Sequence, residues 1–326
     1  MPNHLSHEQV ESLQASGAVV PGSGPNIPAG LVLRTLGRVG LPHSEVVGRI
    51  DTDSSDDLSA RNETLSSSPF LQESYLASYN SVSKIIGLTA ETMPIAGDDN
   101  LLDQLSKLKS TFELFTSLGF NPEISLSPIN RPLDYWEELA STVQASPLNP
   151  DEPDPEHQGQ TRKVLRNGGL YVSDQVKEEW GTLIDPAQPS WRVEVISSLD
   201  TPSIVNITSY GYTDKTNVTP SHELNQLLES LGKPEVSERS GVNFNKLLIL
   251  PDIHPGIENY IMYQLSRIIQ KRKPLDPETY SWLNGTLASG RVLAGHWYPS
   301  NGQVNLYWSR SDDRIDGIGV RPSGRG

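Results

Sequence analysis

The chain has 326 residues, enough for one large domain or two of medium size. It contains no cysteine, which excludes disulfides, thiolate zinc sites and thiol nucleophiles. Its net charge of -14 opposes binding to nucleic acid, whose phosphates are bound mainly by Lys and Arg, so we expect no nucleic-acid partner.

The N-terminal part of the chain, to about Ser68, is rich in Gly, Pro, Ser and Asp. Such a segment buries too little apolar area to offset the entropy of ordering. We therefore expect residues 1–70 to form a flexible tail with a short helix at His7–Ala15, or alternatively a docking peptide. The sequence lacks the apolar core of a signal peptide and the roughly 20 apolar residues of a membrane span, so we expect no membrane insertion.

A helix is predicted where the ordered part of the chain begins. Asn100 is a candidate N-cap, and apolar residues follow at helical spacing from Leu101 to Phe115. Gly119 stands where a glycine commonly ends a helix. Structure itself is expected to begin near Phe70.

A short strand and a second helix are predicted next. Residues Glu123–Ser127 alternate as in a strand, which the prolines from Pro128 to Pro132 would break. Asp134 is a candidate N-cap for a helix that carries Trp136 on its apolar face. The two elements together indicate a mixture of helix and sheet.

The segment from Ser146 to Gln160 has the proline and acidic content of a solvated loop. Its carboxylates, Asp151, Glu152, Asp154 and Glu156, are alternative cation ligands. The prolines between them prevent the regular spacing of a calcium loop. A plain acidic loop is therefore the expected structure.

Further strands and one long helix are predicted in the second half. GLYVSD after Gly169 and the alternating Trp191–Ile196 suit an antiparallel sheet. Leu247–Leu250 is a short apolar run. A helix is expected from about Pro255 to Arg272, with one apolar stripe and basic residues that complement the dipole at its C-terminus.

Signatures of catalysis are scarce. The segment beginning His222–Glu223 lacks the second histidine of a zinc-protease helix, because position 226 is Gln. His254 precedes the long helix and is expected to be structural. There is no glycine-rich phosphate loop and no GxSxG nucleophile motif. An enzyme whose site is assembled from distant residues remains an alternative.

The C-terminal segment contains an alternating strand. Its pattern places Val304, Leu306 and Trp308 on a core face and puts Gln303, Asn305, Tyr307 and Ser309 on the opposite face, which we expect to face outward. The following SRSDDRID is too polar to be buried. Its Tyr, Ser, Asn, Asp and Arg side chains are those that antibody paratopes favour, so the segment is either a recognition surface or a plain exposed hairpin.

The motifs WLNG, W-x-P, the valine strand that ends in Trp, and GVRPS together resemble the C-terminal segment of variable proteins diversified by retroelements in phages and small-genome bacteria. SPINRPLDYWEEL, DIHPGIENYIMYQLSRI and LDPETYSWLNG resemble the preceding part of the bacterial variable proteins, so the resemblance extends from about Leu114 to the end. The closing strand is similar, more distantly, to that of formylglycine-generating-enzyme-like domains. Both groups have a C-type-lectin-like fold.

The resemblance implies a mechanism of variation in which template adenines are miscopied, so that AAC or AAT codons come to encode many residue types but not Lys, Glu, Gln, Met or Trp. Gly302 is reachable in this way, whereas Gln303 is not and is expected to be fixed. The other reachable positions are the expected ligand-binding residues: His296, Tyr298, Ser300, Asn301, Asn305, Tyr307, Ser309, Arg310, Ser311, Asp312, Asp313, Arg314 and Asp316.

Two departures from the relatives limit the chemistry. Formylglycine-generating enzymes oxidise through cysteines, which this chain lacks. The Glu-Pro-Asn or Gln-Pro-Asp tripeptide of calcium-dependent lectins is also absent. We therefore expect no cofactor and no obligatory metal, although Asp312, Asp313 and Asp316 are candidates for weak metal binding.

We thus expect a mixed α/β (α+β) fold, with a C-type-lectin-like domain and its helical lead-in at residues 71–326 and a variable region at about 290–326. Trp282, Trp297 and Trp308 are expected in or near the core. The expected function is non-enzymatic binding of a protein or other macromolecule, in the cytoplasm or on a phage particle. An ordinary carbohydrate-binding lectin is the main alternative, and a hydrolase-type enzyme with a concave pocket is the second.

Overall fold

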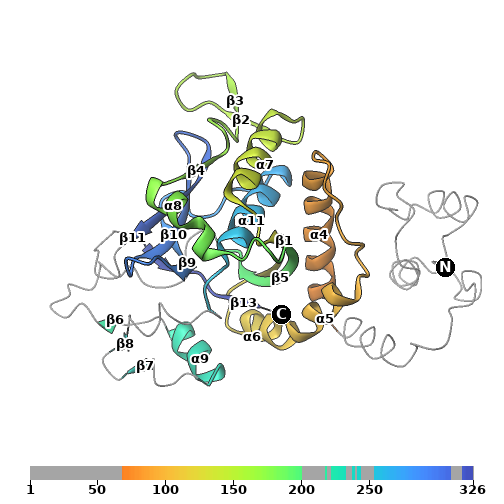
Figure 1. The fold of residues 1–326 in the computed structure, drawn as a ribbon. Helices are drawn as coiled ribbons and strands as arrows, with labels where there is room; N and C mark the ends of the chain where they lie inside the picture. Colours follow the sequence, from red (N-terminus) through yellow and green to blue (C-terminus); the bar gives the residue numbers. More distant parts are fainter. Residues whose placement is uncertain are drawn as a thin grey trace, which may run out of the picture.

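The computed structural model describes residues 68–199, 217–218, 222–232, 237–238, 241–243, 253–309 and 318–325. These residues form a mixed α+β fold, as the sequence predicts (Figure 1). The helices are α4 (Pro69–Ile86), α5 (Asp99–Lys107), α6 (Lys109–Ser117), α7 (Leu133–Ala145), α8 (Asp174–Leu183), α9 (His222–Ser230) and α11 (Ile257–Ile269). The predicted helix at His7–Ala15 and the run Leu247–Leu250 lie outside the described residues.

The strands form a five-stranded sheet of order β12-β9-β10-β11-β4, three-stranded sheets of order β1-β5-β13 and β6-β8-β7, and the pair β2-β3. Their bounds are β1 (Pro122–Ile129), β2 (Asp151–Pro153), β3 (Thr161–Lys163), β4 (Leu170–Val172), β5 (Ser190–Ser197), β6 (Asn217–Val218), β7 (Ser237–Glu238), β8 (Gly241–Asn243), β9 (Tyr280–Thr286), β10 (Val292–Tyr298), β11 (Gln303–Ser309), β12 (Ile318–Val320) and β13 (Ser323–Arg325). None of the described helices is long and apolar enough to cross a membrane.

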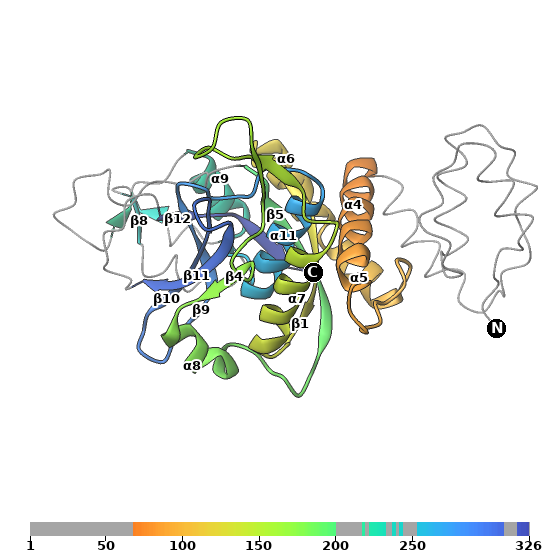
Figure 2. The same ribbon diagram turned by 90° about the horizontal axis from the view of Figure 1, so that it is seen from above.

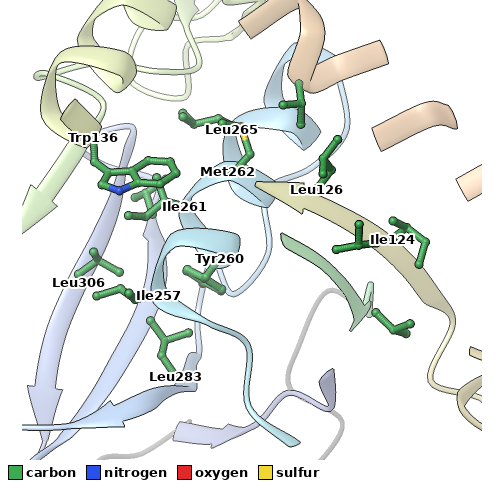
Figure 3. Close-up of a cluster of buried hydrophobic side chains, with 14 of the residues drawn as sticks. Ile124, Leu126, Trp136, Ile257, Tyr260, Ile261, Met262, Leu265, Leu283 and Leu306 are labelled. Atoms are coloured by element: carbon green, nitrogen blue, oxygen red, sulfur yellow. The ribbon is translucent and has the colours of Figure 1, made fainter. Parts of the chain in front are cut away.

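Helix α11 is the centre of the molecule. It contacts β1 on one side and β9 and β10 on the other, and α4 lies on the side away from the five-stranded sheet (Figure 2). Figure 3 shows Ile257 of α11 beside Leu306 of β11, with Leu126 of β1 on the other side of the helix. Every residue from Ile257 to Ile268 is buried, so the helix is covered on all sides and not only along the predicted apolar stripe. The helix is also shorter than the predicted Pro255–Arg272.

Strand β1 is longer than predicted because Pro128 does not interrupt it. β1 lies at an edge, where its outward N–H groups are free for partners from α4. The Ser74 and Ser78 hydroxyls accept hydrogen bonds from Ile124 N (2.7 Å) and Leu126 N (2.9 Å). Pro128 occupies the next outward position, where no ladder hydrogen bond is lost.

The helix predicted to begin at Asn100 is in fact the pair α5 and α6, with a break at Leu108. Its N-cap is Asp98, whose carboxylate accepts from Asn100 N (3.1 Å) and Leu101 N (3.3 Å). Gly119 ends α6 with a φ of 78°, as the sequence predicts.

One predicted helix cap needs correction. Asp134 does not cap α7; the N-cap position is Pro132, and Asp134 lies in the first turn of the helix. The difference is two residues, which is common at helix ends. Helix α4 begins at Pro69, next to Phe70, near which structure is expected to begin.

The predicted acidic loop and the predicted antiparallel sheet also differ from the structure. Residues 151–153 form β2, which pairs with β3 as a hairpin. β5 pairs with β1 in antiparallel fashion, as expected, but β4 is parallel to β11. β4 and β11 are far apart in the chain, so local alternation carries no information about their relative direction.

The C-terminal residues close the fold. β12 joins the edge of the five-stranded sheet and β13 pairs with β5. Between them, the fully buried Arg321 pairs with the fully buried Asp276 at 2.5 Å. Arg321 also donates to Ser197 O (2.7 Å), Leu199 O (2.6 Å) and Ser281 Oγ (3.0 Å). One side chain therefore ties together β5, β9 and the loop before β9.

Candidate functional site

The inner face of the five-stranded sheet is part of the core. Val304 and Leu306 are fully buried, as the alternation predicts. Trp282 and Trp297 are also buried, and Trp308 is partly buried against the core with the Arg291 guanidinium 3.4 Å from its ring centre. All three tryptophans therefore lie where the sequence predicts.

The opposite face of β10 and β11 carries the predicted recognition residues. The antiparallel register sets His296 opposite Asn305 and Tyr298 opposite Gln303. Cross-strand partners project from the same face of a sheet, so these side chains lie together, and Tyr307 joins them by alternation. The predicted division of the strand into two faces is thus correct.

Five aromatic rings from four strands meet on this face. His296 lies 4.3 Å from Tyr280, 5.5 Å from Tyr307 and 5.8 Å from Tyr298, measured between ring centres. Tyr171 of β4 extends the group, 5.6 Å from Tyr307. We call these four tyrosines around His296 the tyrosine patch. Tyr171 and Tyr298 are more than 40% exposed, so the patch reaches the surface.

The expectation that the whole face is exposed is wrong. His296, Asn305 and Ser309 are buried, as is Gln303. Strand alternation assigns a side chain to a face, but the large rings of β4 and β9 cover the middle of this face. The predicted binding residues with exposed or half-buried side chains are Tyr298, Ser300, Asn301 and Tyr307. The predicted residues Arg310, Ser311, Asp312, Asp313, Arg314 and Asp316 lie outside the described residues.

His296 and Asn305 form a buried polar pair at the bottom of the tyrosine patch. Asn305 Nδ2 lies 3.3 Å from His296 Nε2. The other amide atom of Asn305, Oδ1, is buried and has no hydrogen-bond partner among the residues that the structure describes. Burial lowers the pKa of His296 from 6.5 to about 4, so the ring is neutral near pH 7. Burial, with the neighbouring tyrosines, raises the pKa of Tyr307.

The lowered pKa of His296 predicts a loss of stability in mild acid. Below pH 6.5 the unfolded chain takes up a proton at this residue, whereas the folded chain stays neutral to about pH 4. The His296 contribution to the free energy of unfolding should therefore fall by about 3 kcal/mol between pH 7 and pH 4. Urea unfolding of the wild type and of His296→Gln at several pH values in this range gives the slope of the free energy of unfolding against pH, which should be smaller in the variant. Asn301→Gln, an exchange at an exposed residue that removes no titratable group, should keep the wild-type slope.

Two members of the tyrosine patch, Tyr171 and Tyr280, were not predicted as site residues. Alternation in GLYVSD sets Tyr171 apart from Leu170 and Val172, and its burial pattern confirms this. The signal was therefore present in the sequence. What the sequence does not show is that β4 lies beside β11 and β9 beside β10.

The acidic segment after α7 is a set of ion pairs. Asp151 lies 3.2 Å from Lys163, and one Glu152 oxygen lies 3.0 Å from both Arg162 and Arg166. Within the described ranges, no three His, Asp or Glu side chains converge in a way that could hold a metal ion. Asp151, Glu152 and Asp154 therefore form ion pairs with neighbouring basic side chains.

A hollow of about 650 Å³ lies away from the tyrosine patch, between α4, α6, β1 and α11. One of its two carboxylates, Glu123, accepts from Arg272 at 2.5 Å and from the Tyr263 hydroxyl at 2.7 Å. Burial alone would raise the pKa of Glu123, but these hydrogen bonds outweigh burial and lower it. Glu123 is thus a paired anion near neutral pH.

The tyrosine patch and the adjoining turn at residues 299–302 form the candidate site, a surface of aromatic rings and small polar groups. Such a surface suits binding by contact. Comparisons of the chain with protein-family models, with curated proteins and with solved structures found no match.

Proposed function

We propose that this protein is a binding protein whose ligand rests on the tyrosine patch and the adjoining turn. The observation that carries the proposal is the convergence of Tyr171, Tyr280, Tyr298 and Tyr307 from four strands around a neutral histidine. Tyrosine offers a large, stiff contact area at low entropic cost, together with a hydroxyl. Such rings are enriched where proteins contact other proteins.

We further propose a C-type-lectin-like fold and diversification by a retroelement. The α+β architecture with a C-terminal hairpin is compatible with that fold. Gln303, a position on the predicted outward face that adenine miscopying cannot reach, is buried and donates to Asn167 O, as a fixed structural residue would. Tyr298, Ser300 and Asn301 are reachable and exposed. The buried His296 and Asn305 are reachable too, so we expect variation there to be limited by packing.

Sequencing the DNA around the gene tests diversification. We expect a near-copy of the codons for residues 290–326 whose mismatches fall at adenines, next to a reverse-transcriptase gene. Within that copy, mismatches should occur at codons 298, 300 and 301 and not at codon 303. Flanking DNA without such a repeat would refute diversification and would leave a binding surface of fixed sequence.

Carbohydrate binding is the second candidate, because a row of tyrosine rings can stack on sugar faces while the hydroxyls bond to sugar hydroxyls. A glycan array probed with the full chain tests it. If one sugar class binds, Tyr298→Ala should abolish the signal. Phe70→Ala, which removes a 76% exposed ring on α4, should leave the signal unchanged. An array without signal would favour a protein ligand.

A further inference from the structure

The turn between β10 and β11, residues 299–302, is held through hydrogen bonds to its backbone atoms. Gly302 N donates to the carbonyl of Tyr298, the residue before the turn, at 2.8 Å and closes the turn. Arg166 Nη2 donates to Pro299 O at 2.7 Å and lies 3.4 Å from Ser300 O. The backbone N of Arg166 donates to Gly302 O at 2.7 Å. Three of the four turn carbonyls are thus bonded to one residue that lies outside the turn.

Asn167 holds the remaining carbonyl. Its Nδ2 donates to Asn301 O at 2.9 Å. All four consecutive carbonyls from 299 to 302 therefore accept hydrogen bonds from Arg166 or Asn167. Gln303, just after the turn, adds a hydrogen bond back to Asn167, from its Nε2 to Asn167 O.

Glu152 fixes the groups that hold the turn. One of its oxygens lies 3.0 Å from Arg166 Nη1 and 3.0 Å from Arg162 Nε. Arg162 Nη2 in turn lies 3.4 Å from Pro299 O. A carboxylate that binds two guanidinium groups orients both, because their planar donors have fixed directions. The two arginine side chains are only 19% exposed, which limits their freedom further.

The side chains at positions 300 and 301 take no part in this network. Both residues are exposed, and in the described part of the chain only their backbone carbonyls are hydrogen-bonded to Arg166 and Asn167. Exchanging Ser300 or Asn301 therefore leaves every bond that shapes the turn in place. Tyr298 of the tyrosine patch lies immediately before the turn, so the two positions adjoin the patch.

We infer that Glu152, Arg162, Arg166 and Asn167 are positioning residues that hold the turn in one shape whatever stands at positions 300 and 301, which makes these two the specificity-determining positions of the surface. The assignment of specificity rests on the proposed binding function; the fixed shape of the turn does not. The ligand that an exposed polar turn beside aromatic rings fits best is the surface of a folded protein, because tyrosines with adaptable Ser and Asn side chains are the combination that protein-binding surfaces favour.

The test measures backbone order in the full-length chain by NMR relaxation, which requires no ligand. In the wild type and in Ser300→Tyr/Asn301→Arg, the amides of the turn should have order parameters of about 0.85, the value of rigid backbone. In Arg166→Met they should fall below about 0.6. Lys177→Met, which removes an exposed ion pair with Glu137, is the matched control and should change nothing in the turn.

Asn167→Gly is a second, milder variant, since glycine accepts the positive φ of 51° at this position. It should loosen the amide of Gly302 without unfolding the protein. A turn that stays rigid in both Arg166→Met and Asn167→Gly would overturn the inference, as would a turn loosened by Ser300→Tyr/Asn301→Arg. A rigid, substitution-tolerant turn with no template repeat in the flanking DNA would refute only the diversification.

Discussion

Arg321→Met should lower the free energy of unfolding by about 3–5 kcal/mol, because it leaves a buried carboxylate without its cation. Asp276 is fully buried and pairs with Arg321 at 2.5 Å. Its other oxygen accepts from the Tyr260 hydroxyl at 2.8 Å, and neutral donors alone stabilise a buried charge poorly. Urea denaturation followed by circular dichroism gives the measurement.

A double-mutant cycle separates the ion pair from packing. Asp276→Asn removes the charge and keeps a residue that tolerates the φ of 56° at this position. The double variant Arg321→Met/Asp276→Asn should be less destabilised than the sum of the two single variants. Lys177→Met removes an exposed ion pair with Glu137 and should cost about 1 kcal/mol or less. Equal losses in Lys177→Met and Arg321→Met would contradict the role of burial.

Gly302→Asn should destabilise the protein by about 2–4 kcal/mol and distort the turn. Gly302 has a φ of 63°, which asparagine tolerates, so backbone strain contributes little. A Cβ at this position, however, would lie 2.4 Å from Val164 O and 2.8 Å from the guanidinium carbon of Arg166. The Arg166 guanidinium cannot move without breaking its hydrogen bonds to the turn, and Val164 O is a backbone atom that cannot shift unless the chain moves with it.

Gly290→Asn is the matched control. Gly290 has a φ of 75° and no atom within 4 Å of an added Cβ, so the same exchange should cost less than about 1 kcal/mol there. Thermal or urea unfolding of both variants gives the comparison. Equal stability of the two variants would show that the turn can shift away from Val164. If Gly302→Asn does fail to fold and the surface is diversified as we propose, its variants should retain glycine at 302 even though adenine miscopying can reach this codon.

Sequence patterns predicted the parts of the fold that local periodicity controls. The centre of α11, the cores of β1 and β5 and the two faces of β11 follow from spacing alone. Their ends differ because capping depends on which neighbouring residue finds a partner. Pro128 is the clearest case, because a proline predicts the end of a strand. The outward N–H groups of this edge of β1 donate to the hydroxyls of Ser74 and Ser78 and not to another strand, so a proline at the next outward position removes no hydrogen bond between strands.

Only the part of the candidate site that one hairpin supplies could be predicted from the sequence. Tyr298, Ser300, Asn301 and Tyr307 were identified from one hairpin and do reach the surface. His296 and Asn305 are buried; His296 lies against the ring of Tyr280 of β9, and Asn305 pairs in register with Tyr171 of β4, strands whose positions beside the hairpin are set by tertiary packing. The sequence identifies Arg321 only as part of the GVRPS motif. Its buried ion pair could not be predicted, because its partner Asp276 lies 45 residues earlier in the chain.

The hairpin that carries the candidate site precedes β12, Arg321 and β13, and these close both sheets. A message with a stop codon or a shifted frame inside the hairpin would yield a chain without them, leaving a buried carboxylate unpaired and two strands without their neighbours. If the surface is diversified as we propose, folding would therefore remove copies with a stop codon or a shifted frame, because such chains lack the strands and the arginine that complete the two sheets.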